Sequence, residues 1–419
     1  MRITWYTSGL VADPPVVTGQ RSEGVEGLSG LGQARGRVLA LAVAIVAVLA
    51  GGTWVALTQA SGGQGTAKAA AEHHSTAKQA SKHRVQPLTV TSITPTAHAQ
   101  TVDGAAPIRV VFSSPLAADS PWPTLSPSID GTWTKVNSRT IEFHPVSGFT
   151  ELTHVKLTIP AGASGVKSAK GGQLAAPVVQ PFRTGKFSTM RLEQLLAQLG
   201  YLPLTWQQIP GDVPLSAADE NGQLSAAYSP PDGTFLWQPG YPAKLQSFWD
   251  EGQPSLILTG AVMAFEADHS LTMDGVPGRG VWNALLSAVA KGQNNPHGYT
   301  YALASQRDPE TLTVWHNGKV ILHTLANTGI PAAPTTIGTA PVYLRYTFQI
   351  MKGTNPDGTK YADPVSWVSY FRSGEAVHYF ARGSYGFQQS LGCVELPLAQ
   401  AKFVWPYMTY GTLVTVTAP

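Results

Sequence analysis

The 419 residues contain one cysteine, Cys393, in the stretch SYGFQQSLGCVELP. A free cysteine is often a small, inert core side chain, so packing is one interpretation of it. The other is a nucleophile, since a thiolate attacks carbonyl carbon when a nearby base removes the thiol proton. The second interpretation requires a base within hydrogen-bond reach of the sulfur.

The histidines restrict which base is available. All eleven precede Cys393 in the chain, which excludes cysteine peptidases in which the cysteine comes before the histidine. The nearest is His378, 15 positions earlier, in GEAVHYF. Two β elements joined by a glycine-containing loop can bring such side chains together. We predict that His378 is the general base and acid. His323 is the alternative base. If His378 is not catalytic, it would be an ordinary polar residue at the end of a strand.

The residues just before the cysteine favour a tight turn. Gly392 permits backbone conformations that other residues avoid, so amide groups near Cys393 can face a carbonyl under attack. We therefore expect Gly392 to support an oxyanion hole. Ser390 either holds this turn or contacts a substrate peptide.

An uncharged run at residues 38–57, VLALAVAIVAVLAGGTWVAL, is long enough to cross a bilayer. Arg35 and Arg37 precede it and the next lysine is Lys68, which predicts a cytoplasmic tail at 1–37 and an exported remainder. A cleaved signal peptide is the alternative. In either case a lone exported cysteine cannot form an intramolecular disulfide, which favours a catalytic role for the thiol.

Composition limits the partners of the exported part. Charged residues make up 13% of the chain and the net charge is +3, without a long basic block, so nucleic acid is not an expected partner. A weakly basic chain suits an anionic polymer such as a bacterial wall. Residues 58–86 are of low complexity and predict a flexible linker. The linker histidines His73, His74 and His83 are not followed by a second group of ligands at the spacing of a metal site, so we expect no bound metal there.

Residues 87–185 alternate between short strand-like runs and turn residues. LTVTSI, IRVVFSS, RTIEFHP and HVKLTIP show the period of two that predicts a small antiparallel sandwich. The pattern resembles the immunoglobulin-like spacer modules of bacterial surface proteins. We expect this region to provide reach away from the membrane.

At residues 186–290 the apolar period becomes helical. MRLEQLLAQLGYLP places four leucines on one helix face, and residues 258–289 are helical again. The pair resembles the peptidoglycan-binding domain of wall hydrolases, with Glu266 in place of the usual glutamine and an insertion at roughly 203–255. A plain helical hairpin core is the alternative.

Residues 299–418 return to strand patterns, including a hairpin signal at Asn317 and Gly318. NGKV, ANTG, PTTIGT and the block from His378 through SLGCVELP resemble the catalytic domain of L,D-transpeptidases, cysteine enzymes that crosslink bacterial peptidoglycan through a β-rich fold. The sequence departs from the family motif at three positions, which are Tyr379 for glycine, Leu391 for histidine or lysine, and Glu395 for arginine.

The resemblance implies a mainly β, multidomain protein that acts on peptidoglycan without a metal or organic cofactor. Cys393 would be the nucleophile, His378 the base, and a backbone carbonyl such as that of Tyr379 would fix the histidine tautomer. Two rival functions remain open. One is a non-catalytic wall-binding protein that keeps the fold, and the other is a hydrolytic L,D-carboxypeptidase in which water resolves the thioester.

Glu395 is the most consequential departure and a candidate for substrate contact. Ionised glutamate only accepts hydrogen bonds, so it cannot replace arginine as a carboxylate receptor. A nearby negative charge also disfavours the thiolate. Either Glu395 pairs with a basic residue such as Arg382 or Arg345, or it selects a substrate whose acidic groups are amidated.

Overall fold

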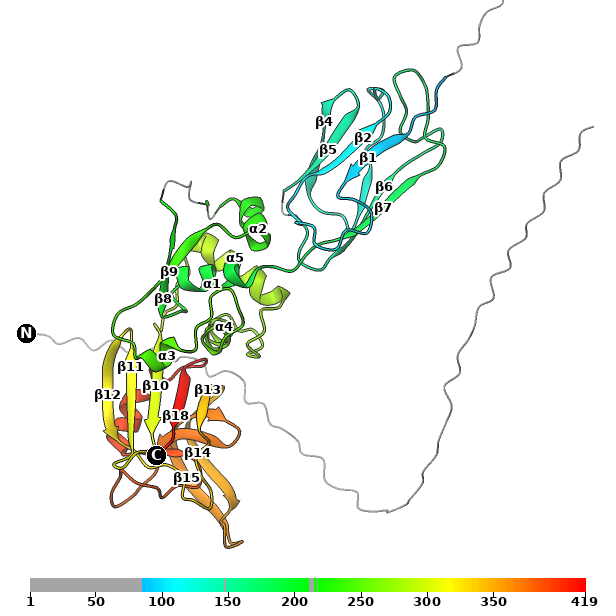
Figure 1. The fold of residues 1–419 in the computed structure, drawn as a ribbon. Coiled ribbons are helices and arrows are strands. Elements are labelled where there is room, and N and C mark those ends of the chain that lie inside the picture. Colours follow the sequence, from blue (N-terminus) through cyan, green and yellow to red (C-terminus); the bar gives the residue numbers. More distant parts are fainter. Residues whose placement is uncertain (1–84, 147, 211–214, 217) are drawn as a thin grey trace, which may run out of the picture. The chain divides into compact units, whose positions relative to one another are not determined.

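The computed structural model describes residues 85–146, 148–210, 215–216 and 218–419 (Figure 1). The predicted tail at 1–37 and the predicted anchor at 38–57 lie outside these residues, as does nearly all of the linker. Within the described ranges, no helix is long and apolar enough to cross a membrane.

The first described region is a two-sheet β-sandwich, as its alternating sequence predicts. One sheet has the strand order β1-β2-β5-β4 and the other β3-β6-β7. In β6, Val155, Leu157 and Ile159 are buried while the intervening side chains face outward. The strands are β1 (Val90–Thr94), β2 (Ile108–Phe112), β3 (Thr124–Ser126), β4 (Gly131–Asn137), β5 (Thr140–Pro145), β6 (His154–Ile159) and β7 (Val178–Arg183).

The middle region is mostly helical, with one small two-stranded antiparallel sheet. Its leucine-rich helix α1 buries the predicted face, and α5 ends at Gly292, whose φ of 63° is the left-handed conformation that closes helices. The predicted insertion contains both strands of this sheet, β8 and β9, and two short helices, of which α2 lies between the strands in the chain. The elements are α1 (Thr189–Gln198), β8 (Leu204–Gln208), α2 (Glu220–Tyr228), β9 (Gly233–Trp237), α3 (Ala243–Gln246), α4 (Leu256–Asp268) and α5 (Arg279–Lys291).

The C-terminal region contains two sheets, ordered β12-β11-β10-β18-β13 and β14-β15-β16-β17. The predicted turn between β11 and β12 is present, with Asn317 and Gly318 both at positive φ. The elements are β10 (Thr300–Ser305), β11 (Thr311–His316), β12 (Lys319–Leu325), β13 (Gly338–Pro341), β14 (Leu344–Thr354), β15 (Lys360–Arg372), β16 (Glu375–Tyr379), β17 (Val394–Leu396), α6 (Leu398–Val404) and β18 (Leu413–Thr417).

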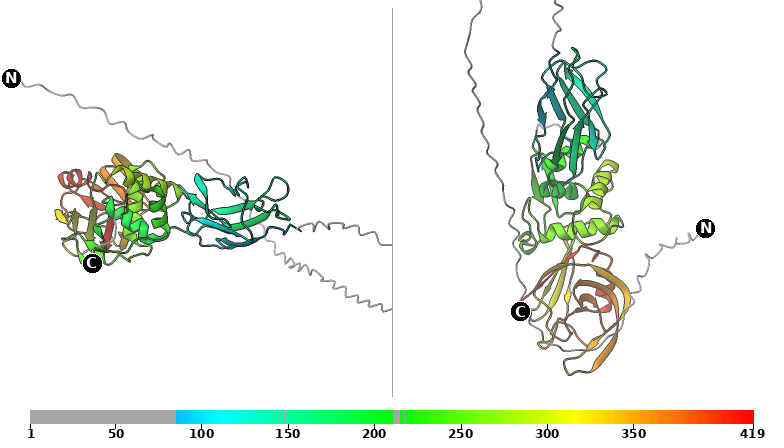
Figure 2. Two further views of the ribbon diagram at one scale, coloured as in Figure 1. Left: turned by 90° about the horizontal axis from the view of Figure 1, so that it is seen from above. Right: turned by 90° about the vertical axis from the view of Figure 1, so that its right-hand side faces the viewer.

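An apolar core joins the two C-terminal sheets and α6. Val314 and Val414 from the first sheet pack with Phe371 and Val394 from the second and with Val404 of α6. The right-hand view of Figure 2 shows β14 and β15, in orange, as a long curved hairpin. The packed sheets hold β16, which carries His378, and β17, which Cys393 immediately precedes, while this hairpin extends beside them.

The middle region shares its apolar core with the C-terminal region. Tyr299, Tyr301 and Leu413 belong to the same buried cluster as the helices α1, α4 and α5. Backbones also meet closely, because a Cβ added at Gly260 would lie 2.5 Å from the carbonyl oxygen of Gly411. The helices therefore complete the core of the C-terminal sheet.

This shared core makes a prediction about stability. Gly260→Ala forces its methyl group against the Gly411 carbonyl, and we expect it to lower the free energy of unfolding by about 1–3 kcal/mol. Gly280→Ala is the matched control in α5, since its added Cβ would meet nothing within 4 Å. Calorimetry should show one transition for both regions shifting down only in Gly260→Ala. Equal behaviour of the two variants would contradict the close approach.

Candidate active site

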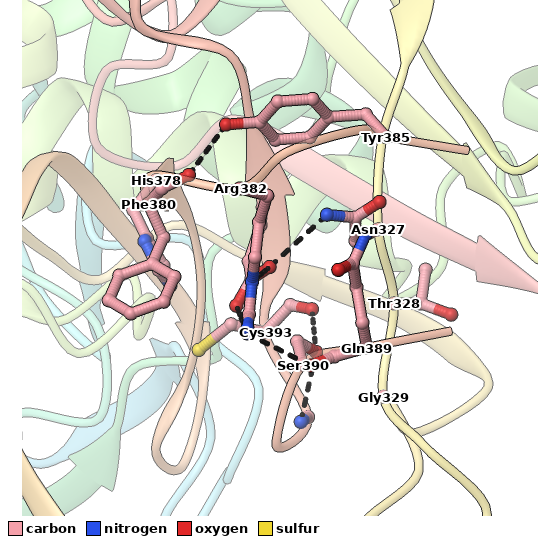
Figure 3. Close-up of polar contacts among 12 residues, drawn as sticks. Asn327, Thr328, Gly329, His378, Phe380, Arg382, Tyr385, Gln389, Ser390 and Cys393 are labelled. Carbon is pink, nitrogen blue, oxygen red and sulfur yellow. Dashed lines mark hydrogen bonds and ion pairs between the residues drawn. The ribbon is translucent and has the colours of Figure 1, made fainter. Parts of the chain in front are cut away.

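Parallel pairing of β16 with β17 brings the candidate residues together. His378 lies opposite Glu395, and Val377 lies opposite Val394. Because side chains alternate along a strand, Cys393, Glu395 and His378 share one face of this sheet. Since His378 is paired with Glu395, Cys393 two residues earlier is the diagonal neighbour of His378 in the register. Both residues are labelled in Figure 3. Residues 15 positions apart in the sequence thus meet through strand register.

The turn that precedes β17 is fixed by a serine. Ser390 is fully buried, and its hydroxyl donates to the Cys393 carbonyl at 2.6 Å while accepting from the Gly392 amide at 3.2 Å. Gly392 has a φ of 109°, a conformation that side chains disfavour. Of the two roles considered for Ser390, the geometry favours holding the turn, since a buried hydroxyl with two internal partners is not open to a substrate.

Cys393 and His378 line one cavity of about 250 Å³. Arg382 and Glu395 contribute to the same wall, and Leu391 lies at its edge with 37% of its surface exposed. The opposite wall comes from the β14–β15 hairpin, through Met351, Asn355, Tyr361, Asp363 and Val365. The cavity can admit a peptide carbonyl beside the thiol.

The tautomer of His378 is set by a backbone oxygen. Its Nδ1 lies 3.0 Å from the Tyr379 carbonyl, which can only accept, so Nδ1 carries the hydrogen and donates it. This leaves the Nε2 lone pair free to take a proton. Burial lowers the pKa of His378, so the imidazole is neutral at neutral pH.

The Cys393 thiol is protonated in the resting protein. Burial raises its pKa to about 12, and the charges of Glu395 and Glu375 act in the same direction against an opposing contribution from the Ala376 amide. Its Sγ lies 3.7 Å from the Gly374 carbonyl oxygen. The cavity is therefore lined by a neutral thiol and a neutral imidazole.

The buried carboxylate of Glu395 forms an ion pair with the half-buried Arg382. The guanidinium donates from Nε to Oε2 at 2.8 Å and from Nη2 to Oε1 at 2.7 Å, the bidentate geometry that suits arginine and carboxylate. The other predicted partner, Arg345, instead stacks on the Trp405 ring at 4.0 Å. Both oxygens of the Glu395 carboxylate thus have hydrogen-bond donors within the chain itself.

Two residues of the site had no predicted role. Asn327 is fully buried, and its amide donates to Glu395 Oε2 at 3.3 Å while its Oδ1 accepts from the Gly386 amide at 3.0 Å. Glu310 accepts from both the amide and the hydroxyl of Thr328. The motif ANTG, which contains Asn327 and Thr328, marked this segment as part of the site. The contacts of the two residues could not be predicted, because their partners are distant in the sequence.

The alternative base, His323, lies elsewhere. It is exposed on β12, where its Nδ1 is 2.8 Å from the Thr313 hydroxyl across the hairpin. The cavity is lined instead by residues of β14–β16 and the 380–395 segment. Its position gives His323 no route to the thiol.

Known protein families account for two regions of the chain. Residues 299–416 match the family model described as the L,D-transpeptidase catalytic domain. This part of the chain is therefore similar to L,D-transpeptidase catalytic domains. Residues 84–184 match the model of a bacterial Ig-like domain, so both predictions of fold are confirmed. The two matches leave residues 186–290 outside, and peptidoglycan binding by that region stays a prediction.

Similar solved structures include three L,D-transpeptidases. One from Mycobacterium smegmatis is 15% identical, with 80% of this chain and 100% of that chain covered and a TM-score of 0.27. L,D-transpeptidase 3 from Mycobacterium tuberculosis is 15% identical, with 78% and 98% covered and a TM-score of 0.27. The catalytic domain from E. faecium is 29% identical, with 28% and 95% covered and a TM-score of 0.26. No curated protein matched the chain.

The ion pair between Arg382 and Glu395 allows a test of how much charge pairing contributes to stability. Arg382→Met leaves the Glu395 carboxylate without its guanidinium, and we expect a loss of up to about 3 kcal/mol, at the lower end for such pairs because Arg382 is 27% exposed. The double exchange Arg382→Glu with Glu395→Arg should recover part of this loss. Denaturant unfolding measures both.

Arg372→Met is the control, because within the described residues the Arg372 side chain donates to the backbone carbonyls of Thr336 and Ile337 and not to a carboxylate. It should cost less than Arg382→Met. A double exchange no more stable than the sum of its single variants would show that charge pairing is not what holds this segment.

Proposed function

We propose that this protein is a cysteine L,D-transpeptidase that crosslinks peptidoglycan stem peptides through a thioester on Cys393. The observation that carries the proposal is one cavity lined by the only thiol of the chain and by a histidine whose Nδ1–H is held by the Tyr379 carbonyl, which leaves Nε2 to accept a proton. The domain match supplies the reaction class, and the residues supply the roles.

In the first step the Cys393 Sγ attacks the carbonyl carbon of the third residue of a donor tetrapeptide. The thiol proton passes to His378 Nε2 as the S–C bond forms, because neither group is charged at rest. The imidazolium then gives that proton to the departing terminal D-alanine amine as the C–N bond breaks. The Tyr379 carbonyl keeps Nδ1–H in place throughout.

In the second step an acceptor amine attacks the thioester carbon. His378 Nε2 removes a proton from this amine, a new amide bond forms, and Sγ leaves and recovers the proton. Water in place of the amine gives the carboxypeptidase reaction through the same thioester. The Gly392 amide is bound by Ser390, so we assign oxyanion stabilisation to its neighbours in the turn.

The remaining regions are proposed to place this site in the cell envelope. The uncharged run at 38–57 with arginines before it supports export and membrane attachment. The Ig-like domain would act as a spacer. Residues 186–290 are proposed to bind the wall, supported by the DGVPGRGVW signature at 274–282.

The nucleophile and base can be tested with imipenem and intact-protein mass spectrometry. Wild type should gain a covalent adduct and Cys393→Ala should gain none. His378→Ala should acylate about 10²–10⁴-fold more slowly, the usual contribution of general base catalysis. His323→Ala should acylate within about twofold of wild type.

Adduct formation by Cys393→Ala would remove the nucleophile assignment, and a slow His323→Ala with a fast His378→Ala would reverse the base. The same proteins incubated with a tetrapeptide donor and an amine acceptor report the reaction class. Crosslinked product supports the transpeptidase, released D-alanine without crosslink supports the carboxypeptidase, and neither product with no adduct supports the non-catalytic alternative.

The ionisation state of the resting site makes a separate prediction. With a Cys393 pKa of about 12, the thiolate fraction and the rate of alkylation by iodoacetamide should rise about tenfold per pH unit from pH 7 to 9, with no plateau. The urea-unfolded chain, with an ordinary thiol pKa near 9.0, should level off as the pH passes that value. A plateau near neutral pH in the folded protein would indicate a thiolate–imidazolium pair instead.

A further inference from the structure

A second cavity, of about 410 Å³, lies in the middle region, with no residue in common with the cavity at Cys393. Its walls come from α1, from strand β8 and from α2. Two of these three elements belong to the insertion at 203–255. The insertion thus builds a pocket that the simple helical pair would not have.

A buried arginine forms the floor of this pocket. Arg191 is 3% exposed, and its guanidinium donates to Gln194 Oε1 at 2.9 Å and to Gln223 Oε1 at 2.8 Å. Both partners are neutral amides. Among the described residues its Nε has no hydrogen-bond partner and no carboxylate pairs with it. Burial without a countercharge lowers the pKa of Arg191 to about 10, and the group remains cationic at neutral pH.

The two glutamines are themselves held in position. Gln194 Nε2 donates to the Pro231 carbonyl at 2.8 Å, and Gln223 Nε2 donates to the Ser216 carbonyl at 3.0 Å. Each amide oxygen is thereby turned toward Arg191. A cation that is buried in this way and has no carboxylate partner among the described residues is costly to the fold, and an anionic ligand would offset that cost.

The other walls suit a sugar. Trp206 is half-buried and lines the pocket, and its ring rests on β9, where a Cβ at Gly233 would lie 2.5 Å from Trp206 Nε1. Gln198 and Thr205 add exposed polar groups at the rim. An aromatic face with amide and hydroxyl groups around it provides stacking and hydrogen bonds for a saccharide.

We propose that this pocket binds a saccharide bearing a carboxylate, with Arg191 receiving the carboxylate and Trp206 the sugar face. The inference rests on the proposed wall binding by residues 186–290 and adds its site and ligand group. Arginine suits this role because its planar fork matches a carboxylate bidentately. Muropeptides, which combine amino sugars with free peptide carboxylates, are the fragments of this chemistry that the proposed enzyme would meet.

The test is calorimetric titration of the full chain in mild detergent with a disaccharide–tripeptide. The fully amidated fragment, chitotriose and a sugar phosphate are the comparison ligands. Wild type should bind the carboxylated fragment at least tenfold more tightly than the amidated fragment and chitotriose. Arg191→Met should lose at least tenfold in affinity. Arg307→Met, which removes an exposed arginine from the loop after β10, outside the middle region, should keep wild-type affinity.

Gln198→Glu gives a second variant that does not disturb the core. Gln198 is exposed at the rim, so the new carboxylate should lower the affinity for the anionic fragment at least tenfold. This variant can be measured even if Arg191→Met does not fold. Affinity unchanged in both variants would overturn the proposal. Tighter binding of the sugar phosphate than of the muropeptide would overturn the choice of carboxylate.

Titration before and after acylation by imipenem separates this site from the catalytic one. Binding that depends on Arg191 and survives acylation supports the pocket. If acylation abolishes binding and Arg191→Met does not affect it, the ligand binds in the cavity at Cys393. That result would overturn the proposed pocket as the binding site. If imipenem gives no adduct while Arg191-dependent binding persists, the pocket stands and the proposed enzyme does not.

Discussion

The carboxylate of Glu395 connects three segments that are far apart in the chain. It lies on β17, receives a bidentate guanidinium from Arg382 in the loop after β16, and accepts from the Asn327 amide after β12. Asn327 also exchanges backbone hydrogen bonds with Glu395 in both directions. These contacts fix where β17 begins, and Cys393 lies two residues before Glu395. The position of the thiol therefore depends on this buried charge pair.

The same pair explains how an acidic residue is tolerated beside a nucleophile. An unpaired carboxylate near Cys393 would disfavour thiolate formation strongly, and Glu395 does contribute to the raised pKa of the thiol. Arg382 opposes that charge at hydrogen-bond distance, and the Glu395 charge also favours a protonated His378. Burial and the Arg382 charge act against it and lower the pKa of His378 overall, so the arrangement disfavours both a standing thiolate and a standing imidazolium. Proton transfer at the moment of reaction suits it better than a preformed ion pair.

Local sequence patterns identified the sandwich strands, the leucine-rich helix and the Asn317–Gly318 hairpin because each depends on neighbours in the chain. The order of histidine and cysteine also pointed to His378. Asn327 and Glu310 were not assigned roles, since a buried amide or carboxylate is defined by partners that only the fold brings near. Glu395 shows this limit most clearly. Its two candidate arginines were equivalent in the sequence, and only the loop after β16 decides between them.

The boundary between the middle and C-terminal regions is another feature that sequence patterns predict only in part. Composition changes near residue 299, yet Tyr299 and Tyr301 pack among the helices, and the backbones of Gly260 and Gly411 touch. Backbone contact of this kind requires glycine on both sides, so neither region can vary there independently. The helices thus have a structural role in completing the C-terminal sheet. Arg191 has no such role, because its burial costs stability when no carboxylate among the described residues pairs with it, and it is not part of the shared core. A group retained at that cost, in a pocket made by an insertion, is better explained by a ligand than by packing.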